Sequence, residues 1–165
     1  MTPDKLLVQW LQQLAEADRS AKTIARYRGI IIQLLAWHEQ AERRPLGLEN
    51  LTPITLISYR THLQKKRAPA TVNIHISAVR SWCQWLFEKG FLEENPALNL
   101  KLVGQPQTDA PEPLSNTAVN ALLREARRGR HGKRDQAIVQ MLLQTGIRIG
   151  ECQALCWQDI TFKER

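Results

Sequence analysis

The chain has 165 residues, 43% of them hydrophobic, and its 23 lysines and arginines against 16 aspartates and glutamates give a formal net charge of +7. This composition excludes an acidic disordered tail and supplies enough apolar side chains for one or two small cores. No run of about eighteen apolar residues occurs, and residues 1–5 lack the layout of a signal peptide, so we expect no membrane span and a cytoplasmic protein. Three cysteines fit that compartment, because an odd number without framework spacing does not predict disulfides.

Positive charge is concentrated in the first part of the chain. Residues 1–103 hold 14 basic and 9 acidic side chains, whereas residues 104–165 hold 9 and 7. The first part is therefore the better suited to bind a polyanion. A basic composition also keeps a protein in solution, so charge alone does not assign a function.

Apolar residues recur at helical spacing through the first hundred positions and predict four helices, over about 3–17, 20–40, 52–67 and 69–90. The start signals are a serine cap at Ser20 and proline in the first turn at Pro3, Pro53 and Pro69. Four helices with short connections predict a compact antiparallel bundle, which we place at residues 1–98.

Three prolines and a glycine within residues 104–113 predict an extended linker, and we place the whole linker at residues 99–113. After it, Ser115 caps a helix, a second helix runs from about 133 to 144, and a short third helix lies around 150–156. Residues 157–162 are expected to form a strand. Residues 114–165 number 52, close to the lower limit for an independent core, so we interpret this part as an incomplete domain.

The region after the linker carries the most specific motif. The second predicted helix of this region ends in Thr145-Gly146. The residues that follow are, in order, Arg148, Glu151, Leu155 and a Trp157–Asp159 pair. This order resembles the opening of the catalytic domain in tyrosine recombinases, the phage-integrase and Xer-type family. The first hundred residues resemble the core-binding domain of the same family, through Ser20, Thr23 and Tyr27, the segments 70–73 and 77–80, and Asn95-Pro96-Ala97.

The resemblance covers nearly the whole chain and implies a mainly α fold. It consists of a four-helix SAM-like core-binding bundle, a linker, and the first helices of a truncated α+β catalytic domain. It also implies a function in site-specific DNA recombination or integration, with duplex DNA and other recombinase protomers as partners and no membrane.

In that family the first active-site arginine grips the scissile phosphate, and the resemblance gives this role to Arg148. A guanidinium suits it, because its planar fork donates two parallel hydrogen bonds to an oxyanion and keeps its charge. Glu151, three residues later, could hold the guanidinium in orientation. The alternative is that Arg148 and Glu151 form an ordinary surface pair.

The family's nucleophilic tyrosine and its His-x-x-Arg pair have no counterpart at the expected places. Tyr27 and Tyr59 are the only tyrosines, and both lie in the first bundle, where Tyr27 is expected to pack in the core. His131 and Arg134 have His-x-x-Arg spacing but precede Arg148, which we interpret as a coincidence. We therefore expect the chain to be inactive as an enzyme by itself.

Neither a metal nor a cofactor is predicted. Cys152 and Cys156 would supply half of a zinc site, but no further ligands lie nearby, so packing thiols are favoured. No glycine-rich phosphate loop of a nucleotide-binding protein occurs, and the resemblance implies cofactor-free strand exchange.

Polar side chains on the second and fourth helices, and in the basic segment between the third and fourth, are phosphate and base-edge donors. The candidate DNA-binding residues are Lys22, Thr23, Arg26, Lys65, Lys66, Thr71, Asn73, His75 and Arg80. Family members often have basic residues just after the Thr-Val-Asn of the fourth helix, where this chain has Ile74-His75, so fewer phosphate contacts are expected there. The alternative for the whole set is the solvated face of an amphipathic bundle.

Two other functions are compatible with the sequence. One is a short, non-catalytic DNA-binding protein that competes with a full recombinase at its sites. The other is a helical protein-interaction module without affinity for DNA.

Overall fold

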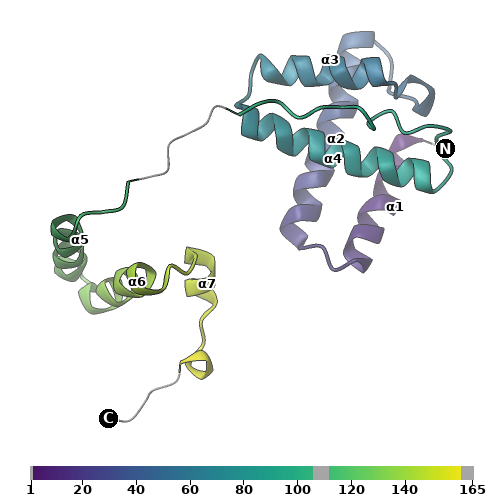
Figure 1. The fold of residues 1–165 in the computed structure, drawn as a ribbon. Coiled ribbons are helices and arrows are strands. Elements are labelled where there is room, and N and C mark those ends of the chain that lie inside the picture. The colour runs from purple at the N-terminus through teal and green to yellow at the C-terminus, as the bar shows by residue number, and fades with distance from the viewer. Residues whose placement is uncertain (1, 106–111, 161–165) are drawn as a thin grey trace. The chain divides into compact units, whose positions relative to one another are not determined.

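The computed structural model describes residues 2–105 and 112–160 and contains seven α-helices and two short 3-10 turns within them, with no strand in either range (Figure 1). The chain divides into two compact units, Met1–Gln107 and Thr108–Arg165. The predicted mainly α class is thus confirmed. Within the described ranges, no helix combines the length and the apolar character that crossing a membrane requires.

The first unit is built from four helices and one 3-10 turn. Their bounds are α1 Pro3–Glu16, α2 Ala21–Glu42, η1 Leu48–Asn50, α3 Pro53–Gln64 and α4 Pro69–Glu88. The start signals in the sequence operate as predicted, because Ser20 Oγ accepts from the Thr23 N–H, and proline lies in the first turn of α1, α3 and α4. The Thr52 hydroxyl caps α3 in the same way.

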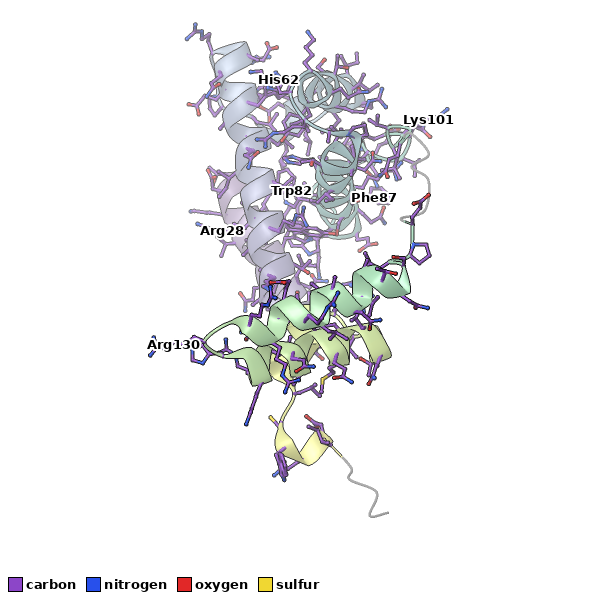
Figure 2. All side chains as sticks on the ribbon, turned by 90° about the vertical axis from the view of Figure 1, so that its left-hand side faces the viewer. Arg28, His62, Trp82, Phe87, Lys101 and Arg130 are labelled. Carbon is purple, nitrogen blue, oxygen red and sulfur yellow. The ribbon has the colours of Figure 1, made fainter. Side chains whose placement is uncertain are left out.

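Helix α4 is the centre of this unit, since it packs against α1, α2 and α3. Its side chains Trp82, Cys83 and Leu86 are fully buried, and Figure 2 shows Trp82 between the helices. Burial raises the pKa of the Cys83 thiol to about 12, so this cysteine packs as a neutral thiol. The Trp85 indole N–H donates to Gln13 Oε1 of α1 at 2.6 Å. A helix covered on so many sides leaves few of its polar positions in solvent.

The chain reverses after α4 at Gly90, whose φ of +73° lies in the region that favours glycine. It then returns over α3 and α4 (Figure 1), with Ala97 and Leu100 buried. We call residues 99–103 the strap. Asn73 of α4 pairs with both backbone groups of Val103, and Arg60 and Arg80 donate to backbone carbonyls of the strap. These residues lie in the predicted linker, but in the structure they pack on the first unit.

The second unit contains α5 Asn116–Arg128, α6 Gly132–Thr145, α7 Ile149–Ala154 and the 3-10 turn η2 Trp157–Asp159. Helix α6 packs against both α5 and α7. Gly132 permits the tight connection from α5 to α6, since a Cβ there would lie 1.9 Å from the carbonyl oxygen of Arg127.

No large apolar side chain is buried in the described part of the second unit. Several of them are well exposed, among them Leu122, Leu143, Ile149, Leu155 and Trp157. This exposure agrees with the expected small core, because three short helices cover little apolar surface.

The predicted strand at the end of the chain is wrong for its four described residues, 157–160. Trp157–Asp159 forms the 3-10 turn η2, in which the Asp159 carboxylate accepts from the Cys156 N–H at 2.8 Å. A strand needs a neighbouring strand for its backbone hydrogen bonds, and residues 112–160 contain none. Residues 161 and 162 of the predicted strand, and residues 106–111 of the predicted linker, lie outside the described ranges.

Candidate phosphate-binding arginine and nucleic-acid interface

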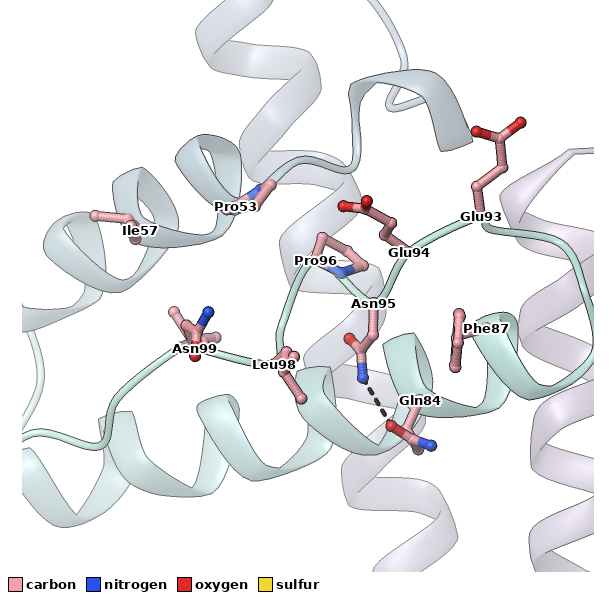
Figure 3. A pocket seen from close by; sticks show the side chains of 11 residues that line it. Pro53, Ile57, Gln84, Phe87, Glu93, Glu94, Asn95, Pro96, Leu98 and Asn99 are labelled. Atoms are coloured by element: carbon pink, nitrogen blue, oxygen red, sulfur yellow. Dashed lines mark hydrogen bonds between the residues drawn. The ribbon is translucent and has the colours of Figure 1, made fainter.

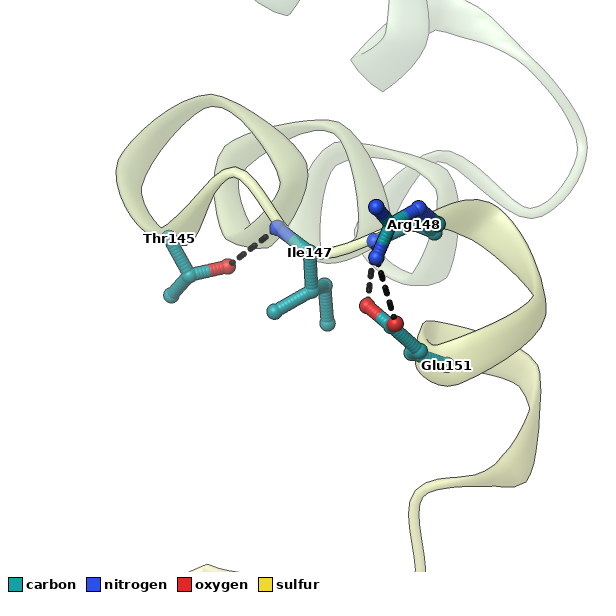
Figure 4. A network of polar contacts seen from close by, with 4 residues as sticks. All are labelled: Thr145, Ile147, Arg148 and Glu151. Carbon is teal, nitrogen blue, oxygen red and sulfur yellow. Dashed lines mark hydrogen bonds and ion pairs between the residues drawn. The ribbon is translucent and has the colours of Figure 1, made fainter.

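A tight turn after α6 carries Arg148. Helix α6 ends at Gly146, which has a φ of +66° and donates its N–H to the Leu142 carbonyl. The Thr145 hydroxyl accepts from the Ile147 N–H at 3.4 Å, and Arg148 then caps α7 (Figure 4). The arginine therefore stands between two helix ends, on backbone held by hydrogen bonds, as the Thr-Gly motif predicts.

Glu151 contacts Arg148 in two ways. One carboxylate oxygen lies 3.1 Å from the guanidinium Nη1, and the other accepts from the Arg148 backbone N–H at 2.8 Å (Figure 4). The Arg148 side chain is 86% exposed, so the remaining guanidinium donors face solvent. An exposed pair of this kind is worth under about 1 kcal/mol in stability. The pair leaves most of the guanidinium donors open.

Exposed basic side chains of the first unit lie on α2 and in the segment just before α4. Lys22 and Arg26 of α2 are exposed, as are Lys65, Lys66 and Arg67 between α3 and α4. The pKa of His75 is lowered first by its burial and then by the positive charges of Arg67 and Arg26. Both arginines therefore lie close enough to act on one imidazole, and they bring charge from two different elements to one place.

The first turn of α4 adds an electropositive helix end to this region. Ser20 caps α2 and Thr52 caps α3, but no side chain caps α4, whose N-cap residue is Ala68 and whose first helical residue is Pro69. Free N–H groups and the helix dipole make such an end favourable for an anion. Thr71, in the same turn, is half-buried.

Three of the predicted DNA-binding side chains are used inside the first unit. His75 is 5% exposed, and its Nδ1 lies 3.1 Å from the Tyr59 hydroxyl. The Asn73 amide is paired with Val103, and the Arg80 guanidinium donates to the Leu100 carbonyl.

Two further polar side chains make contacts within the first unit: Thr23, a candidate from the sequence, and Arg60, which was not a candidate. The Thr23 hydroxyl lies 2.9 Å from Ser20 Oγ, within the cap of α2. The Arg60 guanidinium donates to the Lys101 carbonyl of the strap. This contact could not be predicted from the sequence, because the two residues lie 41 positions apart and no local pattern joins them.

Both tyrosines belong to the first unit, whereas Arg148 belongs to the second. Tyr27 stacks on Trp10 with ring centroids 5.8 Å apart, as expected for a packing residue. Tyr59 is buried, and that burial raises the pKa of its hydroxyl far above the usual value, although Arg67 opposes the shift. A raised pKa is the opposite of what activates a hydroxyl as a nucleophile, so Tyr59 does not have that character.

The described ion pairs lie in one unit, and the described residues form no metal site. The ion pairs within residues 2–105 and 112–160 all belong to the second unit, namely Glu125–Arg128, Arg134–Asp135 and Arg148–Glu151. No group of three or more histidine, cysteine or acidic side chains comes together as a metal site in the same ranges. Cys152 is half-buried and Cys156 is exposed.

A groove of about 680 Å³ lies between α3, the end of α4 and residues 93–100 (Figure 3). Ile57, Phe87 and Leu98 give it an apolar wall, and the amide of Asn95 donates to Gln84 Oε1 at its base. Glu93 and Glu94 also line the groove, which makes it a poor site for a polyanion.

Comparison with known proteins shows what the chain is similar to. Residues 7–90 match the family described as phage integrase, N-terminal SAM-like domain, and residues 112–165 match the phage integrase family. The tyrosine recombinase XerC of Rhodospirillum centenum is 31% identical over 160 residues, which are 92% of this chain and 46% of the relative. The XerC of Oceanobacillus iheyensis is 32% identical over 162 residues, 94% of this chain and 50% of the relative.

Among solved structures, the crystal structure of XerA recombinase matches with a TM-score of 0.47 and 24% identity, covering 96% of this chain and 51% of that one. The chain spans about half the length of the curated relatives it matches.

Proposed function

The chain belongs to the phage integrase family, and we propose that it is the DNA-binding portion of a tyrosine recombinase together with the first active-site arginine. The observation that carries this proposal is the placement of Arg148. It follows the Thr145-Gly146 turn, is oriented by Glu151, and keeps open donors in solvent. The substrate would be a duplex DNA site.

In this proposal Arg148 binds the non-bridging oxygens of the scissile phosphate. Its planar fork donates parallel hydrogen bonds, and its charge opposes the negative charge that grows on the phosphate in the transition state. Glu151 supplies orientation rather than chemistry, through its contact with the terminal nitrogen Nη1, which leaves Nη2 and Nε for the phosphate. In the intact enzyme a tyrosine outside these 165 residues would attack the phosphorus, break the P–O5′ bond and release a 5′-hydroxyl, leaving a 3′-phosphotyrosyl link. The 5′-hydroxyl of the partner strand would then attack this link, join the strands and release the tyrosine.

The DNA-binding face we propose is smaller than the set of candidates from the sequence. It consists of the exposed basic side chains around the uncapped start of α4, together with Thr71: Lys22, Arg26, Lys65, Lys66, Arg67 and Thr71. Asn73, His75 and Arg80 are left out, since their polar groups are engaged inside the protein. Thr23 is left out because its hydroxyl pairs with Ser20 Oγ in the cap of α2.

We propose that residues 1–103 form the core-binding domain, with the strap as its last segment. Residues 114–165 would begin the catalytic domain. Other protomers bound to the same DNA would be its protein partners, and the cytoplasm its place of action.

The experiment is a salt titration of duplex binding by the full chain. Each phosphate contact releases counterions, so the logarithm of affinity falls linearly with the logarithm of salt concentration, with a slope of several units when several phosphates are neutralised. Lys22→Ala combined with Arg26→Ala should weaken binding to all sequences and flatten this slope by about two units. Lys5→Ala combined with Lys89→Ala removes the same charge from other elements and serves as the control. Equal losses in both double variants would show that net charge, and not this face, binds DNA.

A further inference from the structure

The strap is held by side chains that grip its backbone. The Asn73 amide donates to the Val103 carbonyl at 2.9 Å and accepts from the Val103 N–H at 2.8 Å, so one side chain replaces a neighbouring strand. Arg60 Nη1 donates to the Lys101 carbonyl at 3.0 Å, and Arg80 donates to that of Leu100. Leu100 is 4% exposed and is the one fully buried side chain of the strap.

Arg60 and Arg80 hold the strap at a cost in folding stability. Neither has a carboxylate partner in the described ranges, and the Nε atoms of both are buried without a hydrogen-bond partner there. Buried polar groups normally find partners, and each unsatisfied one reduces stability. A segment held by buried Leu100, by half-buried Val103 and by polar contacts of this kind opens at lower cost than the core does.

The strap also determines where the connection to the second unit begins. With the strap bound, the connection begins at Gly104. With the strap released, residues 99–103 join the connection and add at most about 17 Å of reach, at about 3.4 Å per residue. The length of a tether sets the effective concentration of one tethered module at the site of the other.

We propose that the strap is a latch, with Asn73 as its main clasp, that sets the length of the tether between the two units. The clasp lies one turn into α4, next to the basic residues 65–67, so the latch and the proposed DNA-binding face share one helix end. Only this link to DNA rests on the proposed function. The latch itself is a property of the free chain.

The test is limited trypsin digestion of the full chain without DNA, following cleavage after the exposed Lys101. Asn73→Asp keeps the acceptor for the Val103 N–H but loses the donor to its carbonyl, and should raise cleavage after Lys101 by roughly tenfold, the usual effect of a lost hydrogen bond. Asn99→Asp makes the same chemical change on an exposed strap residue and should leave the rate unchanged. Cleavage in the exposed segment 65–67 is the internal reference. Hydrogen exchange of the Val103 amide should accelerate in parallel.

A second variant changes α3 instead of α4, so it tests the latch without altering the helix that carries Asn73. Arg60→Met lies on α3, keeps an apolar stem, and removes the contact at Lys101, so it should also raise cleavage there severalfold. Unchanged cleavage and unchanged Val103 exchange in both folded variants would overturn the latch. Loss of DNA binding in the Lys22 and Arg26 variant would not bear on it, so the two proposals fail separately.

Discussion

The Tyr59 hydroxyl and the Nδ1 atom of His75 lie 3.1 Å apart in the interior of the first unit, joining α3 to α4. The imidazole is 5% exposed and stands near Arg26 and Arg67. A proton added to this ring would place a third positive charge among the two arginines, without water to solvate it. Burial and the two arginines therefore favour the neutral form of His75.

This requirement predicts a loss of stability in mild acid. The folded pKa of His75 lies below the unfolded value of about 6.5, so at lower pH the unfolded chain binds a proton that the folded chain excludes. The free energy of unfolding should fall as the pH drops below about 6.5, with His75 contributing at most about 1.4 kcal/mol per pH unit. Urea titrations between pH 5 and 8 measure the slope, which His75→Gln should reduce. His131→Gln, at an exposed position, should leave it intact, and equal slopes in all three proteins would contradict the assignment.

The strap predicts a sharp dependence of stability on where the first unit is cut. A fragment of residues 1–98 lacks Leu100 and leaves Asn73, Arg60 and Arg80 without their partners, whereas a fragment of residues 1–104 keeps them all. Burial of one leucine contributes about 1.5–3 kcal/mol, so the longer fragment should be more stable by at least about 2 kcal/mol. Chemical denaturation of the two fragments measures this difference. Equal midpoints would mean that the strap adds nothing to the fold.

The same leucine-to-alanine substitution should affect the free energy of unfolding differently in the two units. Leu34→Ala opens a cavity at a position with 0% exposure and should cost about 2–5 kcal/mol in the unfolding of the first unit. Leu122→Ala changes a side chain that is 43% exposed and should cost under about 1 kcal/mol. Denaturation followed by circular dichroism gives both values. A large loss at Leu122 would reveal that this side chain is covered in solution.

Arg148 predicts a separation of cleavage from binding. In a recombinase that contains these residues together with its tyrosine, Arg148→Lys should leave duplex affinity within about threefold, because charge is kept, and lower strand cleavage by about 10²–10³. Arg134→Lys is the matched control, since Arg134 is likewise exposed and paired with an acidic neighbour, Asp135. Equal effects of the two substitutions on cleavage would remove Arg148 from the active site.

The helices and their starts were predictable because their signals are local. Ser20 and the prolines in the first turns need only the next few residues to act, and the Gly146 turn follows from the absence of a Cβ. The same reasoning could not place Asn73, His75 and Arg80. It assumed one apolar stripe along α4, whereas three helices and the strap cover this helix, and the partners of these side chains lie 16 to 30 positions away.

At the second unit the sequence predicted the geometry of the arginine but not the end of the chain. Glu151 is three residues from Arg148, a spacing that a helix start brings together by itself. Residues 157–162 were expected to form a strand, but a strand is stabilised by its neighbours in a sheet. With no strand in the described ranges, the local cap from Asp159 to Cys156 determines the conformation instead.

The distribution of ion pairs has a consequence for the kinetics of association. Basic side chains of the first unit carry no carboxylate partner within residues 2–105, whereas Arg128, Arg134 and Arg148 of the second unit each have one. An incoming phosphate meets the first group as bare cations, with only mobile counterions to displace, but must compete with a tethered carboxylate for each of the others. Encounter with DNA should therefore be fast and electrostatically steered at α4 and slower at Arg148. On the proposed function, capture of DNA by the first unit should therefore precede the positioning of the phosphate by Arg148.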